Sequence, residues 1–293
     1  MDKNDDKYTS FSRKRIFDFN GKRMDFSVPR VMGIVNVTPD SFYEVGAEDR
    51  QHTSLDMWLK TTEKMLDHGA YIIDIGAVST RPGAAEVSEE EEKTRLLPVL
   101  KKIRKSFPEI IISVDTFRAE IARMAAGEGA DMINDISGGI FDPLMHSCIT
   151  ELKIPYIIMH LQGTPATMQL NPVYKDVLKE VLDFLLKQAL ELESKGHDKI
   201  IIDPGFGFGK TVEHNYTLLS RLDEFVKTGY PVLAGLSRKS MINKVLGTRP
   251  AEALNGTTVL NTIALMKGAG ILRVHDVKEA SEAIRLVNEL NWK

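Results

Sequence analysis

The chain has 293 residues, 43% of them hydrophobic and 27% charged, which is enough to bury one large core. Its 38 Lys and Arg residues and 41 Asp and Glu residues leave a formal charge of −3, so it lacks the global positive field that holds nucleic acid or an anionic membrane nonspecifically. The single cysteine, Cys148, excludes an internal disulfide and a multi-cysteine metal site. We expect a cytoplasmic protein without nucleic-acid or membrane partners, because its apolar runs are too short to span a bilayer.

The N-terminal segment differs in composition from the rest of the chain. Residues 1–14 hold no apolar core segment, and we expect a flexible N-terminus there. Beyond them no low-complexity stretch, heptad run or long linker divides the sequence, so residues 15–293 are predicted to form a single domain. Residues 16–19 and 22–27 alternate apolar with polar side chains around Asn20-Gly21, which predicts a short β-hairpin that could plug the floor of a barrel.

Short β-branched apolar runs recur along the remaining sequence. They lie at 31–35, 71–75, 110–114, 132–133, 155–159, 199–202, 231–234 and 271–272. Because they are apolar along their whole length, they suit strands covered on both faces, and the segments between them have helical periodicity. Eight strands alternating with helices over about 250 residues predict an α/β fold, the (β/α)8 TIM barrel. A doubly wound open sheet is the alternative.

Capping patterns mark several of the predicted helix boundaries. Gly69 and Gly196 fit C-terminal caps. Two pairs are spaced as N-terminal capping boxes, Ser88 with Glu91 and Asp276 with Glu279.

Polar residues follow almost every predicted strand. They are Asn36, Asp74, Asp115, Asn134 with Asp135, His160 with Gln162, Asp203, Ser237 with Arg238 and Lys239, and Arg273 with His275. Any one of them has an alternative explanation as a helix N-cap or a turn former. Since the carboxyl ends of barrel strands form the active face, so many positions together predict a site.

The segment D-P-G-F-G-F-G-K-T at 203–211 imitates a nucleotide-binding P-loop at its end. The P-loop motif requires glycine where this chain has Pro204, which has no amide proton for a phosphate, so we reject that interpretation. The three glycines would allow close backbone approach to a ligand, and Phe206 and Phe208 offer rings to cover a flat heterocycle. A tight turn with core aromatic residues is the structural alternative.

Two groups of candidate residues have complementary chemistry. Cations and hydroxyl or imidazole groups at Ser237–Lys239 and Arg273–His275 suit diphosphate or carboxylate oxygens. Asp115, Asn134 and Asp203 would offer acceptors to a heterocycle rich in N–H groups, and a buried carboxylate stabilises a developing cation. The sequence has no zinc-ligand spacing, so any metal is expected to be Mg²⁺, with Asn36 as candidate ligand.

Eight segments together resemble one family, the dihydropteroate synthases. They are M-G-I-V-N-V-T-P-D-S-F at 32–42, S-T-R-P-G at 79–83, V-D-T-F-R at 114–118, I-N-D-I-S-G-G at 133–139, M-H-L-Q-G-T-P-A-T-M-Q at 159–169, D-P-G-F-G-F-G-K at 203–210, S-R-K at 237–239 and R-V-H-D-V at 273–277. The resemblance covers nearly the whole chain from Val31 onward. It implies a cytoplasmic (β/α)8 enzyme, usually a homodimer and a sulfonamide target, that joins (7,8-dihydropterin-6-yl)methyl diphosphate to 4-aminobenzoate and releases diphosphate with the help of Mg²⁺.

The resemblance also implies roles for individual residues. The pterin-pocket positions are Asp115, Asn134, Met159, Asp203, Phe208 and Lys239, and the diphosphate and Mg²⁺ positions are Arg273, His275 and Asn36. The residues implied for the aminobenzoate are Phe42 in the first loop, Thr80, Arg81 and Pro82 in the second, and Ser237 for its carboxylate. The residues implied to be catalytic are Asp115, Lys239, Arg273 and His275. Ionisation of the pterin diphosphate before the weakly nucleophilic amine attacks agrees with this set.

One position departs from the family pattern. The family commonly has Gly-Glu before S-T-R-P-G, where this chain has Ala77-Val78. A catalytically weak paralogue that binds pterin without turnover therefore stays an alternative. A methyltetrahydrofolate–corrinoid methyltransferase-like domain is a second alternative, although S-R-K and R-V-H-D are not expected there, because no diphosphate leaves in that reaction.

Overall fold

The computed structural model describes residues 15–37, 54–78 and 87–290, and its centre is a sheet of eight parallel strands. In chain order these are β3 (Arg30–Asn36), β4 (Ile72–Gly76), β5 (Ile111–Asp115), β6 (Met132–Asp135), β7 (Tyr156–Met159), β8 (Ile200–Asp203), β9 (Leu233–Ala234) and β10 (Ile271–Val274). Their spatial order is β8-β7-β6-β5-β4-β3-β10-β9. Each predicted strand is therefore present, with ends shifted by a few residues at most.

The sheet closes on itself between its two outer strands. A parallel bridge joins Ile202 of β8 to Val232, directly before β9, and the Ile202 amide donates to the Pro231 carbonyl over 3.0 Å. This closure confirms the predicted TIM barrel and excludes the open doubly wound sheet.

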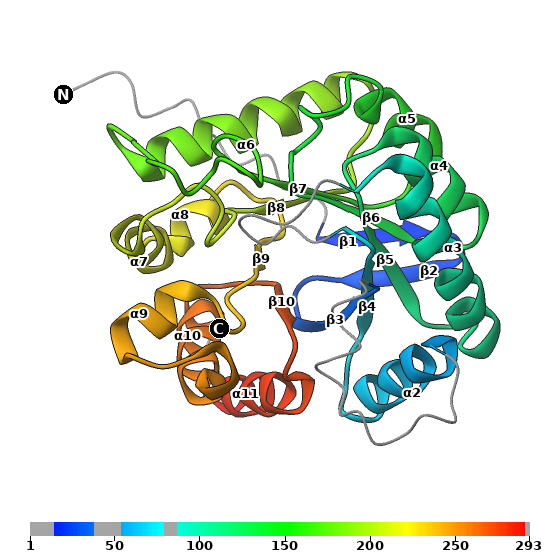
Figure 1. Ribbon diagram of the computed structural model, residues 1–293. Coiled ribbons are helices and arrows are strands. Elements are labelled where there is room, and N and C mark those ends of the chain that lie inside the picture. Colours follow the sequence, from blue (N-terminus) through cyan, green and yellow to red (C-terminus); the bar gives the residue numbers. More distant parts are fainter. Residues whose placement is uncertain (1–14, 38–53, 79–86, 291–293) are drawn as a thin grey trace.

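Helices connect the strands and surround the barrel (Figure 1). They are α2 (Ser54–Asp67), α3 (Glu89–Ser106), α4 (Ala119–Gly127), α5 (Met145–Leu152), α6 (Val177–Ser194), α7 (Val212–Ser220), α8 (Leu222–Val226), α9 (Ser240–Leu246), the short 3₁₀ helix η2 (Pro250–Glu252), α10 (Leu254–Met266) and α11 (Val277–Glu289). Their apolar faces and the outward side chains of the strands form the larger core. Among the described helices, none combines the length and apolar character that crossing a membrane requires.

The predicted N-terminal hairpin consists of β1 (Ile16–Phe19) and β2 (Lys22–Asp25). The turn residues Asn20 and Gly21 both have positive φ, 49° and 73°, as a two-residue type I′ turn requires. The hairpin supplies Phe17, Phe19, Met24 and, just beyond it, Phe26 to a second core. The barrel supplies one residue from each strand, namely Met32, Ile72, Ile111, Met132, Ile157, Ile201, Leu233 and Ile271. The hairpin therefore closes the floor of the barrel.

The two predicted glycine caps are present, and the predicted capping box at Ser88 is present in part. Gly69 and Gly196 have φ of 97° and 86° after α2 and α6. The Ser88 hydroxyl accepts from the Glu91 amide over 3.2 Å, whereas the Glu91 carboxylate pairs with Arg95. The fourth prediction is wrong, because Asp276 makes no side-chain cap at α11. Its carboxylate instead pairs with Arg238, whose Nε and Nη2 donate over 2.9 and 2.6 Å.

Candidate active site

Charged side chains from separate strands converge at the carboxyl-terminal mouth of the barrel. Arg273 of β10 donates from Nε to Asp74 of β4 and from Nη2 to Asp115 of β5, both over 2.7 Å. Asn134 of β6 donates to the same Asp74 oxygen, Oδ2, over 3.1 Å. The register places Asn134 opposite Asp115, and β4, β5 and β6 are neighbours in the sheet, whereas Arg273 reaches the two carboxylates from β10, beyond β3. A guanidinium between two carboxylates in a largely buried setting is a strongly held group.

Asp74 also belongs to this network. From the sequence it was predicted only to be one of several polar residues at strand ends. It is completely buried, and its Oδ1 atom has no hydrogen-bond partner among the described residues. Its sequence signal is a carboxylate in the middle of the apolar strand I-I-D-I-G. A buried charge needs a partner, and Arg273 supplies it.

Burial shifts the acid–base chemistry of this network. It raises the pKa of Asp115 to about 7, against the opposing influence of the Arg273 charge and with a further increase from the Asp74 charge. Burial by itself would lower the pKa of Arg273, but Asp74 and Asp115 outweigh it, and the pKa of Arg273 is raised. The guanidinium therefore stays charged while Asp115 changes protonation state near neutral pH.

A second cluster lies at the end of β8 and in the segments that follow β8 and β9. The Asp203 side chain accepts from the Gly205 amide over 2.7 Å. Lys239 donates to the Phe206 carbonyl, and its ammonium lies 4.3 Å from the centre of the Phe208 ring. Burial lowers the pKa of Lys239 to about 8, with Asp203 acting in the opposite direction. Burial likewise raises the pKa of Asp203, so both groups are held in a poorly hydrated setting.

An apolar wall adjoins these polar groups. Met159 is nearly fully buried and packs in a cluster of residues from the mouth, together with Ile136, Leu161, Met168, Phe117, Phe141 and Phe208. This combination of a flat apolar wall, acceptors and cations can hold an aromatic heterocycle with polar edges. Phe206, in contrast, is fully buried in the larger core, so for this ring the structural alternative holds.

The glycines after β8 serve the protein's own packing. A Cβ at Gly205 would lie 2.0 Å from the His160 carbonyl oxygen, and one at Gly207 would lie 2.9 Å from Cδ of Lys239. The positive φ values of 71° and 82° also favour glycine at both positions. The atoms that come close to Gly205 and Gly207 belong to this chain and not to a ligand. Glycine is therefore required here by the packing of the loop.

Ser237 and His275 lie side by side at the ends of β9 and β10. The Ser237 hydroxyl is 3.0 Å from Nδ1 of His275 and accepts from the His275 backbone amide over 3.2 Å. Arg238, which lies between Ser237 and Lys239 in the sequence, has a positive φ of 56°, and its side chain pairs with Asp276. Arg238 is therefore engaged by a carboxylate, and the cations of the predicted cluster reduce to Lys239 and Arg273, with the imidazole of His275 beside them.

Other polar strand-end residues have structural roles. The Asp135 carboxylate accepts from the Tyr156 hydroxyl and from two backbone amides of the following turn, at Ser137 and Gly139. Gln162 bonds the backbone of Val173 through both its side-chain oxygen and nitrogen. These are the turn-forming roles that the sequence analysis left open for each polar position.

The predicted metal and loop residues are only partly covered by the structure. Asn36 ends β3, and its backbone carbonyl accepts from the Trp58 indole over 3.2 Å. Within the described ranges, no group of three or more His, Cys, Asp or Glu residues could hold a metal ion. The predicted aminobenzoate residues Phe42, Thr80, Arg81 and Pro82 lie outside the described residues, as do the N-terminal residues 1–14. Val78 is the last described residue before the second loop.

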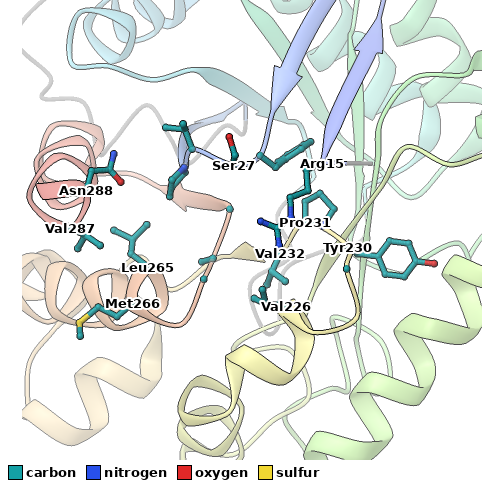
Figure 2. Close-up of a pocket in the computed structure, with 17 residues that line it drawn as sticks. Arg15, Ser27, Val226, Tyr230, Pro231, Val232, Leu265, Met266, Val287 and Asn288 are labelled. Carbon is teal, nitrogen blue, oxygen red and sulfur yellow. The ribbon is translucent and has the colours of Figure 1, made fainter. Parts of the chain in front are cut away.

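A separate cavity of about 480 Å³ lies at the opposite end of the barrel, beside the starts of β3, β9 and β10 (Figure 2). It is lined by residues 26–29, 229–232 and 268–270, together with Arg15, Val226, Leu265, Met266, Val287 and Asn288. None of the predicted site residues lines this cavity. Since parallel barrels carry their chemistry at the carboxyl ends of the strands, we assign the site to the mouth and not to this cavity.

Comparison with known proteins defines the class to which this barrel and its mouth belong. The family model described as pterin binding enzyme matches residues 32–275. Dihydropteroate synthase of Haemophilus influenzae is 50% identical over 269 residues, covering 91% of this chain and 96% of that protein, and the Escherichia coli K12 enzyme is 48% identical, covering 91% and 93%. The chain therefore belongs to the dihydropteroate synthase family of pterin-binding enzymes.

Solved structures agree with this assignment. Yersinia pestis dihydropteroate synthase in a sulfonamide drug complex superposes with a TM-score of 0.87 at 40% identity, covering 95% of this chain and 100% of that one. The Xanthomonas albilineans enzyme with 4-aminobenzoic acid gives a TM-score of 0.87 at 36% identity, covering 95% and 99%. The family resemblance and the fold predicted from the sequence are thus confirmed.

Proposed function

We propose that this chain joins (7,8-dihydropterin-6-yl)methyl diphosphate to 4-aminobenzoate, forming 7,8-dihydropteroate and diphosphate. The observation that carries the proposal is the convergence of two carboxylates, an amide and a guanidinium in one buried network at the barrel mouth. The relatives at 48–50% identity support the same reaction. The structure of a relative with 4-aminobenzoic acid supports that compound as the second substrate.

The pterin ring has matching groups in the second cluster. Asn134 and Asp203 supply an amide and a carboxylate for the N–H-rich edge of the ring, and Lys239 supplies a donor for its oxygen. Met159 and Phe208 supply apolar faces for its plane. The cation–π contact of Lys239 with Phe208 holds the ring of Phe208 in place, which prepares the pocket before the pterin binds.

The chemical step begins with cleavage of the bond between the pterin methylene carbon and the diphosphate oxygen. The electron pair leaves with the diphosphate, and the Asp115 carboxylate stabilises the methylene cation that forms. Arg273 and His275 donate to the departing oxygens, with Arg273 exchanging part of its contact to Asp115 for the diphosphate. The amine nitrogen then forms the new carbon–nitrogen bond and loses a proton to the released diphosphate, so no covalent enzyme intermediate is needed.

The aminobenzoate and the metal complete the proposal. We assign Phe42, Thr80, Arg81 and Pro82 to the aminobenzoate. The donor set fits Mg²⁺, because this ion is commonly held by one or two protein oxygens together with substrate phosphate and water. Asn36 would hold it through its side-chain oxygen, since this residue ends β3 at the mouth of the barrel and is only partly buried. When bound, Mg²⁺ supplies charge neutralisation for the diphosphate.

Product formation tests this function. Purified protein with Mg²⁺ should release diphosphate and form dihydropteroate in equal amounts when both substrates are present. The variant Asp115→Asn should keep the fold and lower kcat by about 10²–10³-fold, the usual effect of removing one electrostatic stabiliser of a transition state. Asp67→Asn, which changes an exposed carboxylate on α2, serves as the matched control and should match the wild type. Pterin binding without product would identify a noncatalytic paralogue, and unchanged turnover of Asp115→Asn would exclude the role of Asp115.

We further propose a homodimer formed through an apolar surface on α9, α10 and α11. Its exposed members are Val245, Leu246, Leu254, Val259, Ile263, Met266, Leu286 and Leu290. Val259, Ile263 and Met266 follow one another at helical spacing on α10, and an apolar patch of this kind is typical of an interface. Ile263→Glu should convert the dimer to a monomer in sedimentation equilibrium, whereas Leu190→Glu, an exposed apolar position on α6, should not. A monomeric wild type would exclude the proposal.

A further inference from the structure

Strand register places Ser237 beside His275. In the parallel pair β9 and β10, Ala234 lies opposite Leu272, and Ser237 and His275 each follow three residues later. The two side chains meet beyond the last backbone pair of the strands, where the Ser237 hydroxyl contacts both the ring and the backbone amide of His275. The Ser237–His275 contact thus continues the pairing of β9 and β10 beyond the last backbone pair of the two strands.

The hydrogen bonds of this hydroxyl define its direction. A serine hydroxyl has one hydrogen and two acceptor lone pairs. The backbone amide of His275 is a donor only, so Ser237 Oγ must accept from it. In the described part of the chain, the other partner of Oγ is Nδ1 of His275. Oγ could also accept from a protonated Nδ1, but its buried hydroxyl hydrogen would then have no partner among the described residues, which favours Nδ1 as the acceptor.

We propose that Ser237 is a positioning residue that holds neutral His275 in the tautomer with its proton on Nε2. In an imidazole, the hydrogen bond made by one nitrogen decides which nitrogen carries the proton. Nε2–H is then a donor for an oxygen of the leaving diphosphate, so this inference rests on the function proposed above. His275 is exposed at the mouth, as this role requires.

The burial of Ser237 separates this role from the one implied by the family resemblance. Ser237 is only 6% exposed, and within the described residues both of its hydroxyl contacts are to His275. A hydroxyl that received the aminobenzoate carboxylate would have to give up its hydrogen bond to Nδ1. We therefore assign Ser237 to His275 and not to the carboxylate.

The neighbouring residues brace this contact. Arg238 and Asp276 follow Ser237 and His275 in the sequence and form a paired contact of 2.9 and 2.6 Å. The Arg238 amide also donates to the Thr257 hydroxyl of α10 over 3.0 Å. Two successive residues of one loop thus contact two successive residues of the other, the first pair through the hydroxyl and the imidazole and the second through a salt bridge. Asp276→Asn weakens the brace without touching the hydroxyl and is the matched control.

The test measures the tautomer and the kinetics separately. Nitrogen NMR of the ligand-free protein at alkaline pH, where imidazole is neutral, should show the His275 proton on Nε2 in the wild type, in Ser237→Thr and in Asp276→Asn. Ser237→Ala should show a mixture of tautomers. It should also lower kcat/KM for the pterin diphosphate by about 10–100-fold, as loss of a partner that orients a functional histidine does. The KM for 4-aminobenzoate should stay unchanged, and Ser237→Thr should restore activity.

Two further measurements decide between the roles. In a His275→Ala background, Ser237→Ala should cause no additional loss, because its effect passes through the imidazole. With aniline, which has no carboxylate, the loss in Ser237→Ala should persist. An unchanged tautomer in Ser237→Ala, or a loss confined to the KM for 4-aminobenzoate and absent with aniline, would overturn the proposal. If the wild type forms no dihydropteroate, the proposed function fails, while the tautomer of the ligand-free protein still tests the assignment of Ser237.

Discussion

At the barrel mouth, burial moves the pKa of an acid and the pKa of a base toward each other. The pKa of Asp115 is raised to about 7 and that of Lys239 is lowered to about 8, because desolvation penalises the charged form of each. The proposed reaction needs Asp115 ionised, to stabilise a cation, and Lys239 protonated, to donate and to hold the ring of Phe208. Both conditions are met together only in a narrow range of pH.

We therefore predict a bell-shaped dependence of kcat/KM on pH. Activity should be lost as pH falls through about 7, where Asp115 gains a proton, and as pH rises through about 8, where Lys239 loses one. Measuring kcat/KM for the pterin diphosphate against pH gives both limits for the free enzyme. Lys239→Arg keeps a charged group at all accessible pH values, so its alkaline limit should disappear. Retention of that limit in Lys239→Arg would assign it to another group.

Residue types were predicted from the sequence more reliably than their partners. Asp74 was visible as a carboxylate in a strand, but its network could not be seen, because its partners Asn134 and Arg273 lie 60 and 199 positions away. Ser237 shows the same limit, since its contact with His275 depends on strand register. The sequence thus shows which functional groups lie at the strand ends, whereas the contacts between these groups depend on how the barrel closes.

The segment after β8 illustrates how an element can imitate another motif. Its Lys210 is buried, and its ammonium donates to the carbonyls of His160, Gly205 and Phe208 over 2.9–3.2 Å and contacts Nδ1 of His160 at 3.0 Å. Burial lowers the pKa of His160 to about 3, with a further decrease from Lys210, so the imidazole is neutral. Lys210 therefore stabilises the conformation of its own loop and does not face a phosphate site, as a P-loop lysine would. Its bond to the Phe208 carbonyl also fixes the backbone of Phe208 at the mouth.

The predicted strand positions failed mainly at the ends, for identifiable reasons. Strands β6 and β10 extend to Asp135 and Val274, because Asn134 and Arg273 face the mouth while their backbones continue the ladder. In the sequence such polar residues look like the start of a loop. Strand β9 is shorter than predicted and begins at Leu233, where its pairing with β10 begins. The apolar runs thus predicted the position of each strand, but the polar functional residues of β6 and β10 made their carboxyl ends look like loops.

Across the whole molecule, the apolar core that closes the barrel and the candidate site residues lie at opposite ends of the barrel. The floor core joins the hairpin to one apolar residue from every strand, and none of the predicted site residues belongs to it. The mouth instead holds buried carboxylates, a guanidinium and an ammonium, which burial alone would destabilise. A TIM barrel commonly divides its two ends in this way.

Met24 tests this division, because it is completely buried at the floor. Met24→Ala should lower the free energy of unfolding by about 2–5 kcal/mol, the usual result of truncating a large core side chain. The midpoint of chemical denaturation should fall, while kcat/KM of the folded variant should stay within about twofold of the wild type, since the barrel strands hold the mouth in place. Arg23→Ala, at the exposed neighbouring position of β2, is the matched control and should change stability by less than about 0.5 kcal/mol. A tenfold loss of kcat/KM in folded Met24→Ala would instead show that the floor and the mouth are energetically coupled.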